Sequence, residues 1–439
     1  MSKKDEEKDE AKTAEPQPEF KFQVLQTNLA PAIGKVARAV ATRSTLPVLS
    51  NILVMALPEQ RLRIVATNLE VAIVAYVSAK VEVSGGTTLP ARAFADLVGT
   101  LPDEELLKFS LKARTETTTI KHGAGKKKGG EINLRGIVAN EFPLLPAHDI
   151  VLAKISGDLL AKVIGKAVPC AAEEQSRPIL TGVLMHFKKS TVTLAASDGF
   201  RLAVAHLKLS EPVEKECKFI VPARVLAEVA RLLGKDPTVT ININANKTSI
   251  QFVGESTEVM SQLIDGTFPD YTQIMPKKHD TQVTLTRKEL LKKVKAALVF
   301  ARESANIIKL SVESDWLGIS AVSAETGDSD DGIEVAVSGE PLVFALNGHY
   351  VLQVLESTDA ERVVIRGTTA SSPFTFRDEG DDNGDLFVIM PMHLGERVPA
   401  PANAAAKKDT EAGSTAPATD AAAAVPAHVT DVAPVATPA

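Results

Sequence analysis

Two acidic clusters come nearest in this sequence to a catalytic or metal-binding pattern. The first comprises Asp328, Asp330 and Asp331, and the second Asp378, Glu379, Asp381 and Asp382. Carboxylates at this density bind divalent cations in some proteins, but this spacing misses the calcium-loop pattern, and glycine-rich acidic segments are typical of exposed hairpin ends. The histidines lie apart, and the two cysteines, Cys170 and Cys217, have no metal-ligand spacing. We therefore predict no metal site.

Other catalytic and targeting patterns are missing as well. The sequence contains neither a phosphate-binding glycine loop nor a nucleophile elbow. It has no apolar run near the roughly 20 residues of a membrane span, and its charged first residues do not resemble a secretion signal. Two cysteines without a disulfide framework suit a reducing compartment. These features predict a cytoplasmic protein with no catalytic residues and no cofactor.

Basic residues on three predicted helices offer a different chemistry, which is contact with phosphate. The helices are expected within residues 20–40, 150–171 and 281–302, where apolar residues recur at helical spacing. The basic residues off the apolar stripes are Lys35, Arg38, Lys162, Lys166, Lys288, Lys292 and Lys295. One solvated helix face often carries lysine, but the same charge on three helices favours a shared anionic partner. Without a base-reading motif, such residues suit sequence-independent contact with DNA.

These helices belong to a repeat that fills residues 20–394. A strand, a turn and a second strand recur at 62–77 and 192–207, and Leu89-Pro90-Ala91-Arg92 matches Val221-Pro222-Ala223-Arg224. In the helices, Ile33-Gly34-Lys35 aligns with Ile164-Gly165-Lys166, and residues 159–163 align with 290–294, both at an offset of 131. The repeat predicts three α+β domains, each with two helices on one face of antiparallel sheets.

The predicted organisation is three domains between two tails. We assign residues 1–19 to a disordered N-terminal tail, 20–146, 147–278 and 279–394 to the domains, and 395–439 to a disordered Ala/Pro-rich tail. Because the tails carry −3 and −2 of the net charge of −6, the domains together carry only −1. A basic face can therefore coexist with an acidic one.

Five stretches, which follow one another in the same order as in the family, make this triple repeat resemble the β subunit of bacterial DNA polymerase III, the sliding clamp family. They are Ser44-Thr45-Leu46-Pro47-Val48-Leu49-Ser50-Asn51, Arg177-Pro178-Ile179-Leu180-Thr181-Gly182, Ser197-Asp198-Gly199-Phe200-Arg201-Leu202, Phe268-Pro269-Asp270-Tyr271 and Val388-Ile389-Met390-Pro391-Met392-His393-Leu394. The resemblance implies a DNA polymerase processivity factor without catalysis of its own. It also implies a homodimeric ring of clamp-type domains around duplex DNA, with sheets outside and helices inside.

The family also implies a peptide-binding cleft between domains 2 and 3, which captures the polymerase, the clamp loader and repair proteins. The matching positions are Leu180, Ser197, Gly199, Phe200, Arg201, Leu202, Pro269, Gln273, Ile274, Asn347, Tyr350, Ser372, Val388, Ile389, Met390, Pro391, Met392 and Leu394. The alternative interpretation of residues 388–392 is a strand that closes the core. Gln273 departs from the basic residue that some relatives carry.

By the same resemblance, Ile132 and Leu134 of domain 1 would meet Val299 and Phe300 of domain 3 at the dimer interface, although all four also fit ordinary core positions. Arg43 matches a DNA-contacting arginine or is a surface charge. The chain continues for 45 residues beyond Leu394, and the loop 123–130, with Lys126, Lys127 and Lys128, is longer than usual. A repeat scaffold that binds only proteins remains the rival hypothesis, although it would not need three basic helices.

Overall fold

The computed structural model describes residues 20–123, 129–174, 176–381 and 384–393. The two predicted tails and the lysines of the 123–130 loop lie outside the described residues. Within the described part, three successive α+β repeats follow one another along the chain, and every strand pair is antiparallel. The predicted fold class is therefore confirmed.

In each repeat, the first strand leads into the first helix. The sixth strand leads into the second helix in repeats 1 and 3, and the fifth strand does so in repeat 2. The first repeat contains β1 (Lys21–Leu25), α1 (Gln26–Val36), β2 (Asn51–Leu57), β3 (Arg61–Thr67), β4 (Val71–Ser78), β5 (Lys80–Val83), β6 (Gly85–Pro90), α2 (Ala91–Thr100), β7 (Leu106–Lys112), β8 (Thr117–His122), β9 (Gly130–Arg135) and β10 (Ile137–Val138). The second contains β11 (Ile150–Ile155), α3 (Gly157–Ala167), β12 (Gly182–Lys188), β13 (Thr191–Ser197), β14 (Arg201–Lys208), β15 (Cys217–Pro222), α4 (Ala223–Leu233), β16 (Val239–Ile243), β17 (Ser249–Val253) and β18 (Thr257–Gln262). The third contains β19 (Thr281–Thr286), α5 (Arg287–Ala301), β20 (Ile307–Val312), β21 (Trp316–Ser323), β22 (Gly327–Glu334), β23 (Ala336–Gly339), β24 (Leu342–Asn347), α6 (Gly348–Ser357), β25 (Arg362–Gly367), β26 (Phe374–Asp378) and β27 (Leu386–Ile389).

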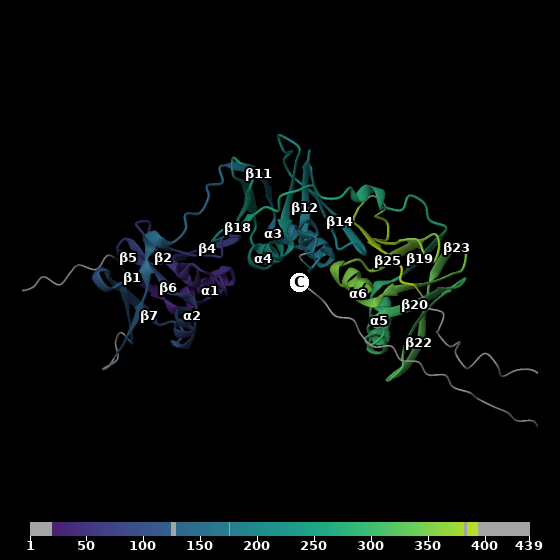
Figure 1. Cartoon of the computed structure of the whole chain (residues 1–439), viewed down its shortest axis with the longest axis horizontal. Helices are drawn as coiled ribbons and strands as arrows, with labels where there is room; N and C mark the ends of the chain where they lie inside the picture. The colour runs from purple at the N-terminus through teal and green to yellow at the C-terminus, as the bar shows by residue number, and fades with distance from the viewer. Residues whose placement is uncertain (1–19, 124–128, 175, 382–383, 394–439) are drawn as a thin grey trace, which may run out of the picture. The chain divides into compact units, whose positions relative to one another are not determined.

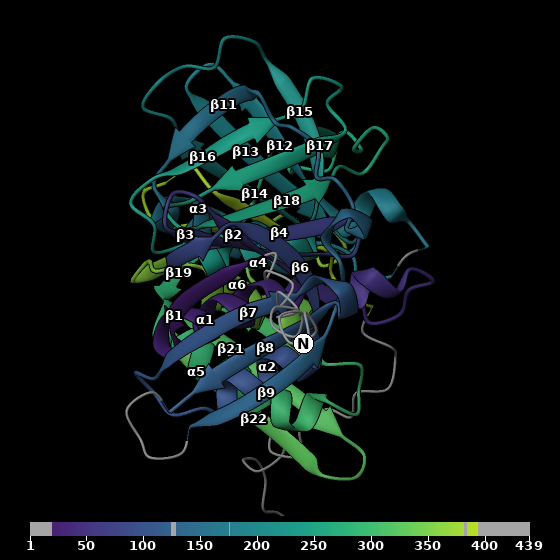
Figure 2. The same cartoon turned by 90° about the vertical axis from the view of Figure 1, so that its left-hand side faces the viewer.

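The strands of the described residues form four sheets, two of which are continuous from one repeat to the next. The nine-stranded sheets have the orders β10-β6-β2-β3-β4-β18-β17-β16-β11 and β15-β12-β13-β14-β27-β26-β25-β19-β23. Repeats 1 and 2 are therefore joined by the β4–β18 pair, and repeats 2 and 3 by β14–β27. The other sheets are shorter, with the orders β5-β1-β7-β8-β9 and β22-β21-β20-β24. Figure 2 shows β7, β8 and β9 of the first of these side by side.

The main core lies between the helices and one face of the sheets. Helices α3 and α4 pack together, as do α5 and α6 (Figure 1). The buried residues are almost all aliphatic, because period-2 strand patterns and helical stripes place Leu, Val, Ile and Ala on the same side. Two smaller apolar clusters cover the opposite face of the sheets, one at each junction between repeats.

The pattern of buried residues shifts the alignment of α5, the first helix of repeat 3, by one residue. The buried positions of α1 (Gln26, Leu29, Ala32, Ile33, Val36) reappear in α3 at an offset of 131, as Gly157, Leu160, Val163, Ile164 and Ala167. In α5 the buried residues are Leu290, Val294, Ala297, Leu298 and Ala301. Leu160 therefore corresponds to Leu290 at an offset of 130, and the offset of 131 predicted for this helix is wrong. The runs Leu159-Leu160 and Leu290-Leu291 look alike in letters, but an offset of 131 would pair the buried Ile164 with the exposed Lys295, whereas an offset of 130 pairs it with the buried Val294.

In the described part of the chain, no helix is both long and apolar enough to span a membrane. Among the same residues, no group of three or more His, Cys, Asp and Glu side chains is arranged to hold a metal ion. Asp331, from the first acidic cluster, instead accepts a hydrogen bond of 2.6 Å from Lys293.

Candidate functional site

An apolar cluster covers the outer face of the sheet where repeats 2 and 3 join. Leu202 of β14 and Val388 of β27 lie opposite each other in the strand register, and both are buried. Leu180 reaches the same cluster from the short 3-10 helix Pro178–Thr181, and Phe268 reaches it from the segment that links the two repeats. The structure thus brings together apolar residues from positions 180, 202 and 388.

A tight turn between β13 and β14 borders this cluster. Ser197 donates a hydrogen bond of 2.7 Å to the carbonyl of Arg201, and the Asp198 carboxylate accepts from the backbone amides of Phe200 and Arg201. Gly199 has a φ of +94°, a conformation that residues with a Cβ rarely adopt. The turn pushes Phe200 outward, so that 61% of this residue is exposed.

Phe200 and Met390 form an exposed apolar pair at the edge of the cluster. The backbone amide of Met390 donates a hydrogen bond of 2.8 Å to the carbonyl of Phe200, which fixes the two residues side by side. Met390 is 37% exposed, whereas Met392 and Pro391 are half-buried. The amide of Met392 donates to the carbonyl of Ala345, which holds this end of the chain on repeat 3.

Ile389 is a correction to the predicted set. Its side chain is completely buried and packs in the main core on the helix side of the sheet. Neighbouring residues of a strand point to opposite faces, so Val388 and Met390 can face the outer cluster only if Ile389 faces the core. Leu394 lies outside the described residues.

Arg201 links the turn to repeat 3. Its guanidinium contacts the Asp198 carboxylate at 2.8 Å, hydrogen bonds to the side-chain oxygen of Gln353, and lies 4.1 Å from the centre of the Tyr350 ring. Burial raises the pKa of Tyr350, and the Asp198 carboxylate raises it further. No sequence pattern indicated Gln353, because only the fold brings α6 next to this turn.

The remaining predicted positions occupy the rim. Asn347 caps α6 by accepting a hydrogen bond of 2.9 Å from the amide of His349. Gln273 is exposed and donates to Asp270, and Ile274 follows it with 45% exposure. Pro269 is exposed, and Ser372 lies in a turn where its hydroxyl is 2.6 Å from that of Thr369.

The predicted DNA-facing residues fall into two groups. Arg43, Lys162, Lys288 and Lys292 are exposed, and Lys162 forms an ion pair with Asp158 of its own helix, at 3.3 Å. Lys295 is also exposed and pairs with Glu356 of α6 at 2.8 Å. Two others contact the next repeat instead. Arg38 pairs with Glu228 at 3.2 Å, and Lys35 donates a hydrogen bond of 3.0 Å to the Thr257 hydroxyl.

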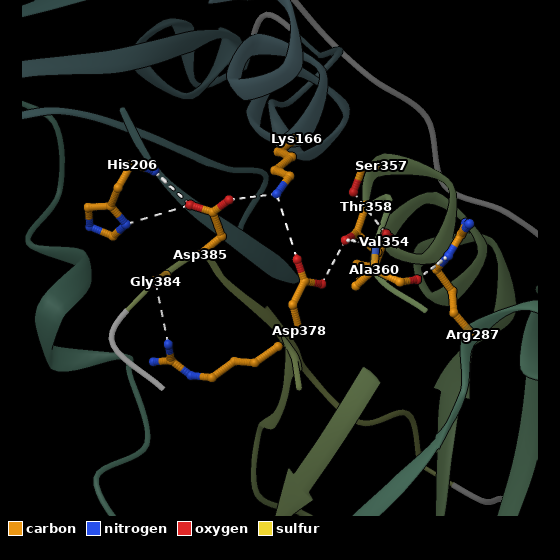
Figure 3. A network of polar contacts seen from close by, with 11 residues as sticks. Lys166, His206, Arg287, Val354, Ser357, Thr358, Ala360, Asp378, Gly384 and Asp385 are labelled. Carbon is orange, nitrogen blue, oxygen red and sulfur yellow. Dashed lines mark hydrogen bonds and ion pairs between the residues drawn. The ribbon is translucent and has the colours of Figure 1, made fainter. Parts of the chain in front are cut away.

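Lys166 departs most from the expected exposed cation. Its side chain is only 17% exposed, and its ammonium lies 2.7 Å from the Asp385 carboxylate and 3.9 Å from that of Asp378 (Figure 3). Burial alone would raise the pKa of Asp385, but hydrogen bonds from His206 and Lys166 outweigh it and lower the pKa to about 2. Lys166 therefore acts as a contact between repeats, and we remove it from the DNA-facing set.

The four residues predicted for a dimer interface lie in repeats 1 and 3. Ile132 and Leu134 are half-buried on β9, which is an edge strand of its sheet. Val299 is 57% exposed near the end of α5, and Phe300 beside it is half-buried.

Comparison with known proteins identifies the family. The sequence matches the N-terminal domain of the DNA polymerase III beta subunit over residues 20–146, the central domain over 154–270 and the C-terminal domain over 272–393. The chain belongs to the DNA polymerase III beta subunit family. Members of this family are accessory processivity factors for a DNA polymerase and not catalysts, so the predicted role as a processivity factor is confirmed.

Individual beta subunits agree with this assignment along their whole length. The chain is 28% identical to the beta sliding clamp of Bacillus subtilis over 377 residues, which cover 83% of this chain and 97% of the relative. It is 29% identical to that of Pseudomonas putida, covering 85% and 100%.

Solved beta subunits also share the fold. The sliding clamp structure from Bacillus subtilis superposes with a TM-score of 0.80 at 27% identity, covering 86% of this chain and all of that one. The clamp of Pseudomonas aeruginosa bound to griselimycin has a TM-score of 0.78 at 27% identity, covering 85% and 100%. DNA and a polymerase are thus partners of this beta subunit in general.

Proposed function

We propose that two copies of this beta subunit close head-to-tail into a ring around duplex DNA. The strand order carries this proposal. β4 and β14 occupy the same place in repeats 1 and 2, and each pairs with the last main strand of the following repeat, β18 or β27. In repeat 3 the equivalent strand is β22, and in repeat 1 the last main strand is β9. Both are edge strands of their sheets.

Pairing β22 with β9 of the partner subunit would complete the pattern. The two short sheets, of four and five strands, would then form a nine-stranded sheet like the two inside the chain. Exposed edge strands are prone to uncontrolled pairing, so a specific partner is the expected way to cover them. A two-fold dimer would contain this interface twice.

The two internal junctions also suggest the register of the third. Ile73 lies opposite Val259, and Ala203 opposite Phe387, at equivalent repeat positions on the helix side. The corresponding residues are Ser329 on β22 and Ile132 on β9, since they lie opposite the core residues Ala321 and Ile120. We therefore expect Ser329 opposite Ile132 of the partner subunit, with Leu134, Val299 and Phe300 covering the same side.

Light scattering and a designed cross-link test the ring. The wild-type chain should give twice its mass of 46.7 kDa. In a Cys217→Ser background, Ile132→Cys with Ser329→Cys should form an intermolecular disulfide. Asp328→Cys is the matched control, because its side chain points to the opposite face and should cross-link far more slowly. A monomer at micromolar concentration, or equal cross-linking by both pairs, would contradict the proposal.

We further propose that the exposed apolar pair Phe200 and Met390, with Ile274, Tyr350, Pro391 and Met392, captures short peptides of the polymerase, the clamp loader and repair proteins. The other junction supports this choice by contrast. There the equivalent positions are Glu70 and Gln262, and Glu70 forms an ion pair with Arg224. Only the junction of repeats 2 and 3 therefore presents apolar side chains at both positions, and Met adapts to varied ligands.

The double variant Met390→Ala with Met392→Ala tests this site. Calorimetry with a polymerase-derived peptide should show a loss of roughly 1–3 kcal/mol, while the dimer persists. Unchanged affinity would place the site elsewhere.

For DNA, we propose that Arg43, Lys162, Lys288, Lys292 and Lys295 keep the duplex centred by contacts to phosphates. A closed ring is retained by topology, whereas an open binder depends on salt-sensitive contacts. Beta subunit loaded on a nicked circle should survive a moderate-salt wash and be released when the circle is cut. Equal retention on linear and circular DNA would contradict the ring. Such a protein would work in the cytoplasm, at the nucleoid during replication.

A further inference from the structure

The two internal junctions share one polar contact at the same repeat position. Lys35 on α1 and Lys166 on α3 are equivalent, at an offset of 131. Each crosses to the next repeat, where Lys35 donates to the Thr257 hydroxyl at 3.0 Å and Lys166 contacts the Asp385 carboxylate at 2.7 Å. We call this pair of interactions the cross-junction lysine contact.

The acceptors of these two contacts are equivalent as well. Thr257 precedes Val259 by two residues, and Asp385 precedes Phe387 by two. Val259 and Phe387 occupy matching positions, because they lie opposite Phe252 and Phe376 on the neighbouring strand and opposite Ile73 and Ala203 across the junction. The contact is therefore a property of the repeat and not of one pair of residues.

The proposed junction between repeat 3 and repeat 1 of the partner subunit lacks both halves of this contact. At an offset of 130, the residue of α5 that matches Lys166 is Ala296, which is exposed. On β9, Ile132 lies opposite Ile120 in the way that Phe387 lies opposite Phe376, so the residue that matches Asp385 is Gly130. Neither an alanine nor a glycine side chain can form a hydrogen bond.

We propose that Lys35 and Lys166 are positioning residues that hold the internal junctions closed, and that Ala296 and Gly130 leave the junction between subunits without this contact. The proposal rests on the proposed ring. It implies that the interface between subunits is the junction that separates most readily, while the junctions within each chain stay closed.

The surroundings of Lys166 fit a structural role. Asp385 also accepts a hydrogen bond of 2.7 Å from the backbone amide of His206 on β14, and Asp378 accepts one of 2.7 Å from Thr358 after α6 (Figure 3). The ammonium of Lys166 thus joins α3 to β26 of repeat 3 and to the residue that precedes β27. Such a partly buried, hydrogen-bonded ion pair contributes more than an exposed one.

Subunit exchange tests the missing contact. Dimers labelled with donor and acceptor dyes are mixed, and the exchange rate is measured for wild type, Ala296→Lys, Gly130→Asp and the double variant. If the proposal holds, the double variant exchanges at least about five-fold more slowly than the two single variants predict together. A side chain at position 130 would contact the His122 ring, and the single variant Gly130→Asp measures the effect of moving that ring. If the double variant shows only the combined effect of the two single variants on the exchange rate, the proposal of a missing contact at the subunit interface is overturned.

Hydrogen exchange tests the existing contact in the whole wild-type chain. Lys166→Met and Asp385→Asn should each speed exchange at least about five-fold in the amides of β27 and β14, and combining them should add little further. Lys162→Met is the matched control on the same helix, because Lys162 pairs with Asp158 of α3 itself, and it should leave these amides unchanged. Unchanged exchange in Lys166→Met would overturn the positioning role.

Loading on DNA separates this role from DNA contact. Lys162→Met should impair loading on nicked circles, and Lys166→Met should not. Impaired loading of Lys166→Met with unchanged amide exchange would overturn the proposal in favour of direct DNA contact. A monomeric wild type would instead contradict the proposed ring, and the amide exchange, which needs no dimer, would still decide the role of Lys166.

Discussion

Replacing Phe200 by alanine should weaken peptide capture without harming the fold. Phe200 is 61% exposed, so it contributes little to the core. An aromatic side chain buries about 150–250 Å² in a contact, and the exposed fraction leaves roughly 120 Å² for a ligand to cover. At about 25 cal/mol per Å² this corresponds to an upper bound near 3 kcal/mol. After the costs of ordering, we expect a loss of about 1–3 kcal/mol, or a Kd increase of roughly 5- to 150-fold.

Calorimetric titration with a polymerase-derived peptide measures this loss. Glu70→Ala is the matched control, because Glu70 occupies the equivalent turn position at the other junction, where its ion pair with Arg224 is exposed. It should leave peptide affinity unchanged. The melting temperature of Phe200→Ala should stay close to that of wild type, since substitutions at exposed sites usually change stability by less than about 0.5 kcal/mol. Wild-type affinity in Phe200→Ala, or an equal loss in Glu70→Ala, would refute the assignment of the site.

Three further predictions concern charge and thiol chemistry. Because the pKa of Asp385 is lowered to about 2, its contacts stabilise the fold above pH 4 by about 2 kcal/mol, and this contribution disappears as the pH falls toward 2. The stability difference between wild type and Asp385→Asn in urea should therefore shrink over that range, and a constant difference would contradict the lowered pKa. Lys288→Glu with Lys292→Glu should impair loading on nicked circles more than retention after loading, which a pull-down at two salt concentrations can show. Burial raises the pKa of Cys170 to about 12, so this thiol should stay unreactive toward maleimide at pH 8 until urea unfolds the chain, and rapid native labelling at Cys170 would count against its burial.

The sequence alone determined the repeat and most of its elements. Period-2 and helical patterns are local, so the step from β15 into α4 at Val221-Pro222-Ala223-Arg224, and its match at Leu89-Pro90-Ala91-Arg92, could be predicted without any knowledge of neighbours. The exposed positions of Lys288 and Lys292 also followed from local pattern, whereas Arg43 was implied by the family resemblance. The positions implied by family resemblance include Leu180, Leu202 and Val388, which the structure brings into one cluster.

Tertiary structure decided everything that depends on partners far apart in the chain. Asp385 lies 219 residues from Lys166, and no local pattern connects them, so a lysine expected to face DNA is instead paired between repeats. The strand register sends Ile389 into the core while its neighbours Val388 and Met390 face outward, although sequence resemblance treats the three alike. The one-residue shift that equates Lys166 with Ala296 appeared only in the burial of α5. Register and pairing depend on which faces meet across an interface, and a single strand or helix does not contain that information.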